Sequence, residues 1–248
     1  YVNGVVGTST AAMSASTSRY QDTAAMDFIN YVQADAVRKA LVGTSSANLP
    51  ILSIAAPFNS GAAIPAGNVT IRDVAGLYIY DNTLLGIVFT GAQVKAYLEY
   101  SAAYFKQISG TGPFTPDQLT NAVTPSAPNG TPDYNYDIMG GAGSSPAESL
   151  NYDIDIAQPV GSRIKNLSYG GTAVSDSQQF VIAINNYRQS GGGGFPGVTT
   201  APVVYNAQVE IRQLIIDWVS ATKTIDPTAF SAQNWRLVSA GQPIQITG

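Results

Sequence analysis

The order in which helix-like and strand-like segments follow one another constrains the fold of this chain most. Apolar residues recur with helical spacing in three segments, 23–42, 93–105 and 208–221. Strand-like runs occupy five others, 52–56, 83–89, 150–156, 163–169 and 180–184. Because the helix-like and strand-like segments do not alternate strictly in β-α-β order, the sequence predicts an α+β fold in which helices pack on a mixed sheet. With no repeat and no visible boundary, residues 1–248 are expected to form a single domain.

Capping signals mark where three of the helices should begin. Asp22 precedes the first apolar-periodic run and is expected to cap it. Thr70 with Asp73 could cap a brief helix, and Thr90 with Gln93 forms a capping box at the start of another. From 109 to 132 the sequence is aperiodic and rich in proline, so a long surface excursion is expected there.

The chain contains no histidine and no cysteine, which excludes much chemistry. Without His there is no Ser-His-Asp triad, imidazole base or His-ligated metal site. Without Cys there is no thiolate nucleophile, zinc finger, iron–sulfur cluster or disulfide framework. Any catalysis within this chain would have to use carboxylates, Lys, Tyr or Ser.

The charge balance bears on partners and compartment. Charged residues make up 11% of the chain, less than half of the roughly 25% that is usual, a profile common in exported proteins. We therefore expect a secreted, periplasmic or cell-surface protein, and Tyr1 in place of Met suggests a processed or trimmed product. A net charge of −4 argues against a nucleic-acid polymer as partner, and no apolar run is long enough to predict a membrane span.

Several familiar motifs are missing or out of context. Neither a phosphate-binding GxxxxGK[ST] loop nor a GxGxxG dinucleotide fingerprint occurs. Two SxxK matches, at 162–165 and 220–223, lack the other motifs of serine β-lactamases, and the first lies in a strand pattern that puts Ser and Lys on opposite faces. A glycosidase would need a carboxylate pair, but Asp153 and Asp155 fit a solvated strand face better.

The most informative segment is 185–196, which reads Asn-Asn-Tyr-Arg-Gln-Ser, four glycines, Phe and Pro. Consecutive glycines allow close backbone approach to a ligand, and Tyr187 beside them offers a flat face for stacking. A second aromatic cluster, at 134–137, precedes the pair Gly140 and Gly141. Two such clusters could clamp a flat heterocycle; the alternative is that both are core or hairpin aromatics.

Six segments together resemble the C-terminal domain of the 5′-nucleotidase family. Within that family they look most like the secreted or periplasmic 2′,3′-cyclic-nucleotide 2′-phosphodiesterase/3′-nucleotidases. The segments, which follow family order over the full chain, are 55–58 (AAPF), 77–84 (LYIYDNTL), 134–137 (YNYD), 159–167 (PVGSRIKNL), 185–188 (NNYR) with its glycine tract, and 234–237 (NWRL).

The resemblance implies a division of labour between two domains. Such enzymes join an N-terminal metallophosphoesterase domain, which binds two metals, to a C-terminal domain that holds the nucleoside or nucleotide. This chain resembles only the second, so no catalytic residue, metal ligand or cofactor is expected within it, and the divalent metals would belong to the other domain. The family's aromatic pair falls on Tyr136 and Tyr187, while the pocket would be shaped by Asn185, Asn186, Gly191 and Gly192.

Departures from the family pattern move the expected recognition from phosphate to base. Gly193 stands where many relatives have an Asp that contacts the nucleoside, and Tyr104 stands where some have an Arg near the phosphate. The loop at 59–63 carries no Lys or Arg. These losses leave open an alternative, a secreted non-catalytic module of the same fold redirected to a carbohydrate, cell-wall or protein ligand.

Overall fold

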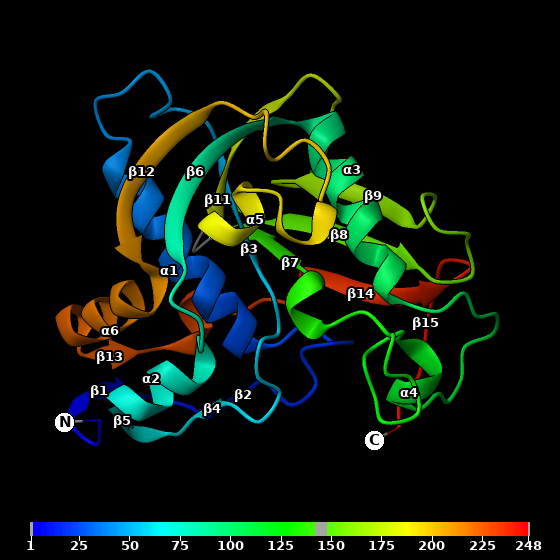
Figure 1. Ribbon diagram of the computed structural model, residues 1–248, viewed down its shortest axis with the longest axis horizontal. Helices are drawn as coiled ribbons and strands as arrows, with labels where there is room; N and C mark the ends of the chain where they lie inside the picture. The colour runs from blue at the N-terminus through cyan, green and yellow to red at the C-terminus, as the bar shows by residue number, and fades with distance from the viewer. Residues whose placement is uncertain (1, 142–147, 248) are drawn as a thin grey trace.

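The described part of this computed structural model, residues 2–141 and 148–247, contains two five-stranded sheets, a three-stranded sheet and a two-stranded ribbon, with helices packed among them (Figure 1). The α+β class with a mixed sheet is confirmed. None of the helices in these residues is long and apolar enough to cross a membrane.

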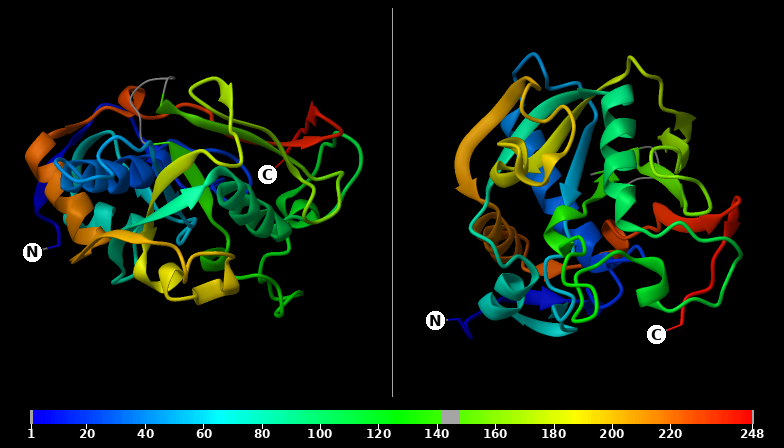
Figure 2. Two further views of the ribbon diagram at one scale, coloured as in Figure 1. Left: turned by 90° about the horizontal axis from the view of Figure 1, so that it is seen from above. Right: turned by 45° about the vertical axis from the view of Figure 1, so that its right-hand side comes forward.

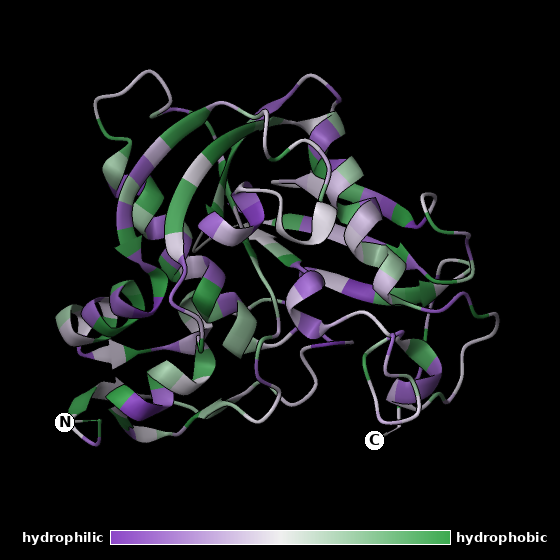
Figure 3. Cartoon of the chain, viewed as in Figure 1, coloured by the Kyte–Doolittle hydropathy of each residue, from purple (hydrophilic) through white to green (hydrophobic). Residues whose placement is uncertain are grey.

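The first five-stranded sheet, here called the site sheet, holds the segments that matter most for function. Its strand order is β12 (Val203–Glu210), β6 (Thr83–Thr90), β11 (Gln179–Asn185), β3 (Ile51–Ala55) and β7 (Ile138–Gly141). β11 and β3 are parallel and the other neighbours are antiparallel. The central strands β6 and β11 are largely hydrophobic (Figure 3), since both of their faces are covered.

The second five-stranded sheet, here called the second sheet, lies beside it. Its order is β10 (Thr172–Ala173), β9 (Ile164–Tyr169), β8 (Leu150–Asp155), β14 (Trp235–Ser239) and β15 (Gln242–Pro243). Helix α3 (Gly91–Ser101) contacts β6 of the site sheet and β9 of the second sheet, and Figure 2 shows it standing between them. α3 therefore ties the two sheets together.

The small sheet joins the first strand of the chain to a short strand that follows α6 (Ile211–Thr222). Its order is β13 (Thr224–Ile225), β1 (Val5–Ser9) and β5 (Gly67–Thr70), with β1 parallel to β13. The ribbon pairs β2 (Met13–Ser14) with β4 (Ala63–Ile64). The remaining helical segments are α1 (Ala24–Ala40), α2 (Ile71–Leu77), η1 (Ala102–Tyr104), α4 (Pro116–Leu119), η2 (Asp133–Asn135), α5 (Asn186–Gln189), η4 (Gly192–Gly194), α6 (Ile211–Thr222) and η5 (Pro227–Ala229).

Two of the three capping signals in the sequence are confirmed, and two helix starts differ from the prediction. The capping boxes at the start of α2 and α3 are both formed. Thr23, and not Asp22, caps α1, because its side chain accepts a hydrogen bond from the Met26 amide. Asp22 turns instead toward β14, where its Oδ2 accepts from the Asn234 amide at 2.7 Å. The last helix begins at Ile211, later than predicted, because β12 continues to Glu210.

Candidate functional site

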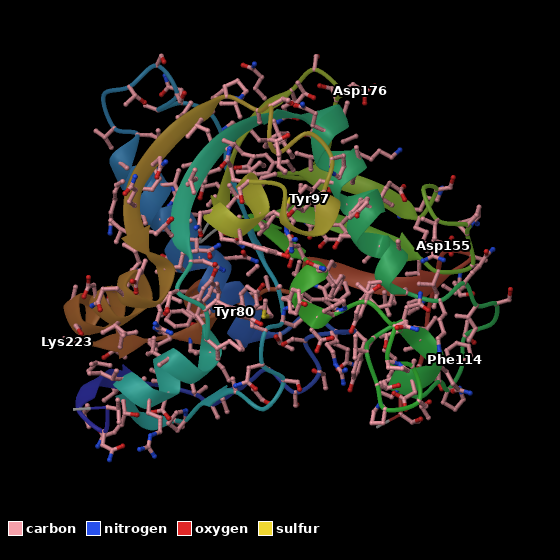
Figure 4. The ribbon with its side chains drawn as sticks, in the orientation of Figure 1. Tyr80, Tyr97, Phe114, Asp155, Asp176 and Lys223 are labelled. Carbon is pink, nitrogen blue, oxygen red and sulfur yellow. The ribbon has the colours of Figure 1, made fainter. Side chains whose placement is uncertain are left out.

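One cavity gathers aromatic side chains from segments that are far apart in sequence. It has a volume of about 370 Å³ and is lined by Phe58, Tyr80, Asn82, Tyr134, Asn185 and Tyr187. Figure 4 shows Tyr80 below α5, near the middle of the face in view. Tyr80, Tyr134 and Tyr187 remain 38%, 41% and 42% exposed, respectively. Exposed aromatic rings that converge on one hollow indicate a binding surface, since large apolar groups left in water are otherwise scattered.

Three of these rings form a continuous wall. Phe58 meets Tyr80 edge to face with ring centroids 5.2 Å apart, and Tyr80 meets Tyr134 edge to face at 6.3 Å. Behind them the buried ring of Tyr78 contacts Phe58 at 4.9 Å. Edge-to-face contacts suit the quadrupoles of aromatic rings and hold each ring at a set tilt.

Tyr187 belongs to a different element and rests on the glycine tract. It lies on α5, and a Cβ placed on Gly192 would come within 2.5 Å of its ring carbons. Gly191 has a φ of +108°, a conformation that residues with side chains rarely adopt. A side chain at Gly192 would displace the Tyr187 ring from this position, and Gly191 is favoured by its left-handed backbone.

The two asparagines before Tyr187 have different tasks. Asn185 is buried, lines the cavity, and caps α5 by accepting from the Arg188 amide through Oδ1 at 2.8 Å. Asn186 Oδ1 accepts from the Thr83 amide at 2.9 Å, which joins α5 to the start of β6. Asn186 therefore positions α5 and does not line the cavity.

Tyr136 lies in the core and does not line the cavity. It is buried at 1% exposure and stacks on Tyr104 with centroids 4.4 Å apart and planes 9° apart. The chain passes from the turn η2, which holds Tyr134, to extended backbone at Tyr136, so the two side chains leave it in different directions. Tyr134 lines the cavity, and the expected pairing of Tyr136 with Tyr187 is corrected accordingly.

A buried ion pair lies beneath the two segments that carry Tyr134 and Tyr187. Arg188 Nε donates to Asp137 Oδ2 at 2.7 Å, and the side chains of Arg188 and Asp137 are only 1% and 0% exposed. The Tyr97 hydroxyl also donates to Asp137. Burial, followed by the negative charge of Asp137, raises the pKa of Tyr97 well above its usual value, so this hydroxyl keeps its proton.

The departures from the family pattern also have structural reasons. A Cβ on Gly193 would lie 2.3 Å from Arg188 Nη1, and the φ of Gly193 is +76°, so an aspartate there would be strained and would displace the Arg188 guanidinium. Tyr104 is buried and its hydroxyl donates to Asp133 at 2.8 Å. Within residues 2–141 and 148–247, no three Asp or Glu side chains gather as they would around a metal ion.

Comparisons with known proteins agree with this fold. A family model described as the 5′-nucleotidase C-terminal domain matches residues 5–200. The trifunctional nucleotide phosphoesterase protein YfkN of Bacillus subtilis is 34% identical over 257 residues, and a 2′,3′-cyclic-nucleotide 2′-phosphodiesterase/3′-nucleotidase of Haemophilus influenzae is 33% identical over 264 residues. Each alignment covers 96% of this chain. The chain belongs to the 5′-nucleotidase C-terminal domain family.

Solved structures support the same assignment. A Staphylococcus aureus protein assigned as a 5′-nucleotidase, solved with alpha-ketoglutarate, superposes with a TM-score of 0.72 at 27% identity, covering 96% of this chain and 41% of that one. A 5′-nucleotidase precursor from Thermus thermophilus shares the fold at a TM-score of 0.68 and 17% identity, over 95% of this chain and 39% of its own. This chain spans 16% of the length of the Bacillus protein and 37% of the Haemophilus protein.

The sequence pointed to part of this site. Asn185, Tyr187, Gly191 and Gly192 do lie together, with the first two lining the cavity. Phe58, Tyr80 and Asn82 were not predicted as site residues, although they lie in segments that carry the family resemblance. Their only signal in the sequence was the aromatic residues within those segments, because the segments lie far from the glycine tract along the chain.

Proposed function

We propose that this chain binds the nucleoside part of a nucleotide in the aromatic cavity and presents its phosphoester to a separate metal-bearing domain that hydrolyses it. The observation that carries the proposal is the convergence of three exposed tyrosines on one cavity of about 370 Å³. Cavities of a few hundred cubic ångströms suit a single small ligand. The printed names of the relatives, a nucleotide phosphoesterase and a cyclic-nucleotide phosphodiesterase, support a nucleotide ligand.

The proposed binding mode is stacking of the base between Tyr187 on one side and the wall of Tyr80 and Tyr134 on the other. A base that stacks on an aromatic side chain gains about 1 to 3 kcal/mol. The amides of Asn82 and Asn185 supply polar groups at the same cavity. This arrangement keeps the aromatic clamp that the family resemblance implies but gives the place of Tyr136 to Tyr134 and Tyr80.

Phosphate charge contributes little to this binding mode. No Lys or Arg lines the cavity among the described residues. Nearby, the Arg188 guanidinium is already paired with the buried Asp137 carboxylate. Arg212 binds the Ile79 carbonyl and the Asp81 carboxylate. The chain is therefore proposed to hold adenosine and its phosphates with similar affinity.

Replacing Tyr187 with alanine should weaken adenosine binding by about 1 to 3 kcal/mol, because one stacking face is lost. Isothermal calorimetry with the purified chain measures this change directly. Tyr169→Ala on β9 of the second sheet is the matched control and should bind as the parent does. An unchanged dissociation constant for adenosine in Tyr187→Ala would contradict the stacking mode.

The chain alone should release no phosphate from 2′,3′-cyclic AMP or 3′-AMP when Mn²⁺ or Zn²⁺ is added. Hydrolysis of this kind uses water activated by a bound metal, and the sequence offers no histidine to hold one. A phosphate-release assay with and without metal tests this. Turnover that depends on added metal and co-purifies with the chain would contradict the division of labour.

The second candidate, a non-catalytic module for carbohydrate, cell-wall or protein ligands, is favoured by one observation, the lack of a cationic side chain at the cavity. A thermal-shift panel separates the two, because a ligand that binds only the folded chain raises its Tm. Nucleosides should raise it and oligosaccharides should not. The reverse would favour the second candidate, and in either case we propose a secreted or periplasmic location.

A further inference from the structure

The two segments that bring Tyr134 and Tyr187 to the cavity are joined through a single buried guanidinium. Arg188 follows Tyr187 on α5, while Asp137 lies three residues after Tyr134. Their side chains are almost completely removed from solvent. The binding mode proposed above does not use either of them, so their burial needs its own explanation.

Every N–H group of this guanidinium has an acceptor. Nε donates to Asp137 Oδ2 at 2.7 Å, and Nη2 donates to Asp137 Oδ1 at 3.1 Å and to the Tyr134 carbonyl at 2.8 Å. Nη1 donates to the Gly192 carbonyl at 2.7 Å and to Asn135 Oδ1 at 3.4 Å. We call Arg188 with these acceptors the guanidinium clip.

Arg188 and Asp137 each make further contacts with the rest of the domain. The guanidinium carbon lies 4.0 Å from the centroid of the Phe195 ring. Asp137 exchanges backbone hydrogen bonds with the Ser101 hydroxyl on α3, at 2.8 and 2.9 Å, and its carboxylate accepts from Tyr97 on the same helix. Figure 4 shows Tyr97 between α3 and the segment that follows α5. The guanidinium clip therefore links three parts of the chain, which are the segment 134–137, the segment 188–192 and helix α3.

The two backbone carbonyls that Arg188 binds belong to residues that hold the two tyrosines of the cavity in place. One belongs to Tyr134, whose ring lines the cavity, and the other belongs to Gly192, on which the Tyr187 ring rests. Arginine presents its donors in a rigid planar fork, so two acceptors bound to one guanidinium have little freedom to move apart. A lysine in its place would present its three donors from one point on a flexible stem, without the planar fork.

We propose that Arg188 is a positioning residue that sets the separation between Tyr134 and Tyr187, so that the cavity is already open to the width of a flat heterocycle before a ligand arrives. This inference rests on the proposed function. A ready-formed cavity lowers the cost of ordering the rings on binding. A buried ion pair is weak evidence for a gain in stability, and its fixed geometry fits a role in positioning.

Arg188→Lys tests the clip because it keeps the positive charge and a donor for Asp137 but loses the fork. Adenosine binding is measured by calorimetry at 10 °C, with circular dichroism to establish that the variant is folded. We expect the dissociation constant to rise roughly tenfold, the scale of a weakened stacking contact. A residue that only stabilises the fold would lower Tm and leave the affinity of the folded chain unchanged. Arg236→Lys, whose partner Asp153 lies on the second sheet, is the matched control and should bind normally.

Amide hydrogen exchange without ligand provides the second measurement. Exchange should become faster in Arg188→Lys at 133–137 and at 186–194, with the rest of the site sheet unchanged. Unchanged exchange in both segments, or unchanged affinity in the folded variant, overturns the positioning role. If the parent chain itself fails to bind adenosine, the proposed function fails, and the exchange data still decide whether Arg188 holds the two segments together.

Discussion

Asp137→Ala is expected to lower the free energy of unfolding by about 3 to 5 kcal/mol, the cost of leaving a buried charge without its partner. The Arg188 guanidinium would remain at 1% exposure with no carboxylate, and the buried Tyr97 hydroxyl would lose its acceptor as well. Urea unfolding followed by circular dichroism measures the change. Asp153→Ala is the matched control, because its partner Arg236 is 46% exposed and water can solvate it. That control should cost no more than about 1 kcal/mol.

The burial of the pair also predicts how the loss can be recovered. Replacing the two charges and the Tyr97 hydroxyl by apolar groups of similar size, in Asp137→Leu with Arg188→Met and Tyr97→Phe, should restore part of the stability, since no unpaired charge remains but the Tyr134 and Gly192 carbonyls lose their donor. A loss below about 1 kcal/mol in Asp137→Ala alone would mean that solvent reaches this carboxylate in solution.

Raising the pH from 5 to 9 is expected to destabilise the folded chain through a buried pair of carboxyl groups, those of Asp22 and Asp27. Burial raises the pKa of Asp22 to about 6. Burial, followed by the negative charge of Asp22, raises the pKa of Asp27 to about 9. The two carboxyl groups also share a side-chain hydrogen bond, which requires a proton on one of them. Both folded-state values lie above the ordinary value of 3.8.

The sign of the pH effect follows from proton binding. Above pH 4 the folded chain binds more protons at this pair than the unfolded chain does, so its stability is complete at or below pH 4 and falls up to about pH 9. One excess proton corresponds to a slope of about 1.4 kcal/mol per pH unit. Urea unfolding at pH 5, 6, 7, 8 and 9 measures the slope.

Asp27→Asn isolates the pair, because an amide N–H can donate to Asp22 as the protonated acid does. Its unfolding free energy should vary much less with pH above 6 and should exceed that of the parent at pH 9. Asp35→Asn, on the same helix but paired with Lys39 at the surface, should keep the slope of the parent. An Asp27→Asn chain with the parent's slope would show that other groups cause the pH effect.

Local signals predicted the elements well because their causes are local. The box of Thr90 with Gln93 starts α3 as expected, since its two hydrogen bonds lie within one turn. Asp22 was misassigned as a cap because its true partner, the Asn234 amide, is 212 residues away. No pattern within a window of the sequence carries that information.

Only part of the site was predicted, because only some of its contacts join residues that are close in sequence. The glycine tract and Tyr187 adjoin in sequence, so their contact could be inferred. The choice between Tyr134 and Tyr136 could not, because it depends on the turn η2 and on the stacking of Tyr136 against Tyr104. Phe58 and Tyr80 enter the site only through the order of strands in the site sheet.

The small sheet has a consequence for how the chain reaches its folded state. β1 has β13 as a parallel neighbour, with Thr8 opposite Thr224, so the first described strand has that partner only after almost the whole chain has been made. Loop closure over such a separation is slow compared with local folding. A chain interrupted before residue 224 would leave one edge of β1 open to pairing with another chain, which makes incomplete synthesis or late proteolysis a route to aggregation.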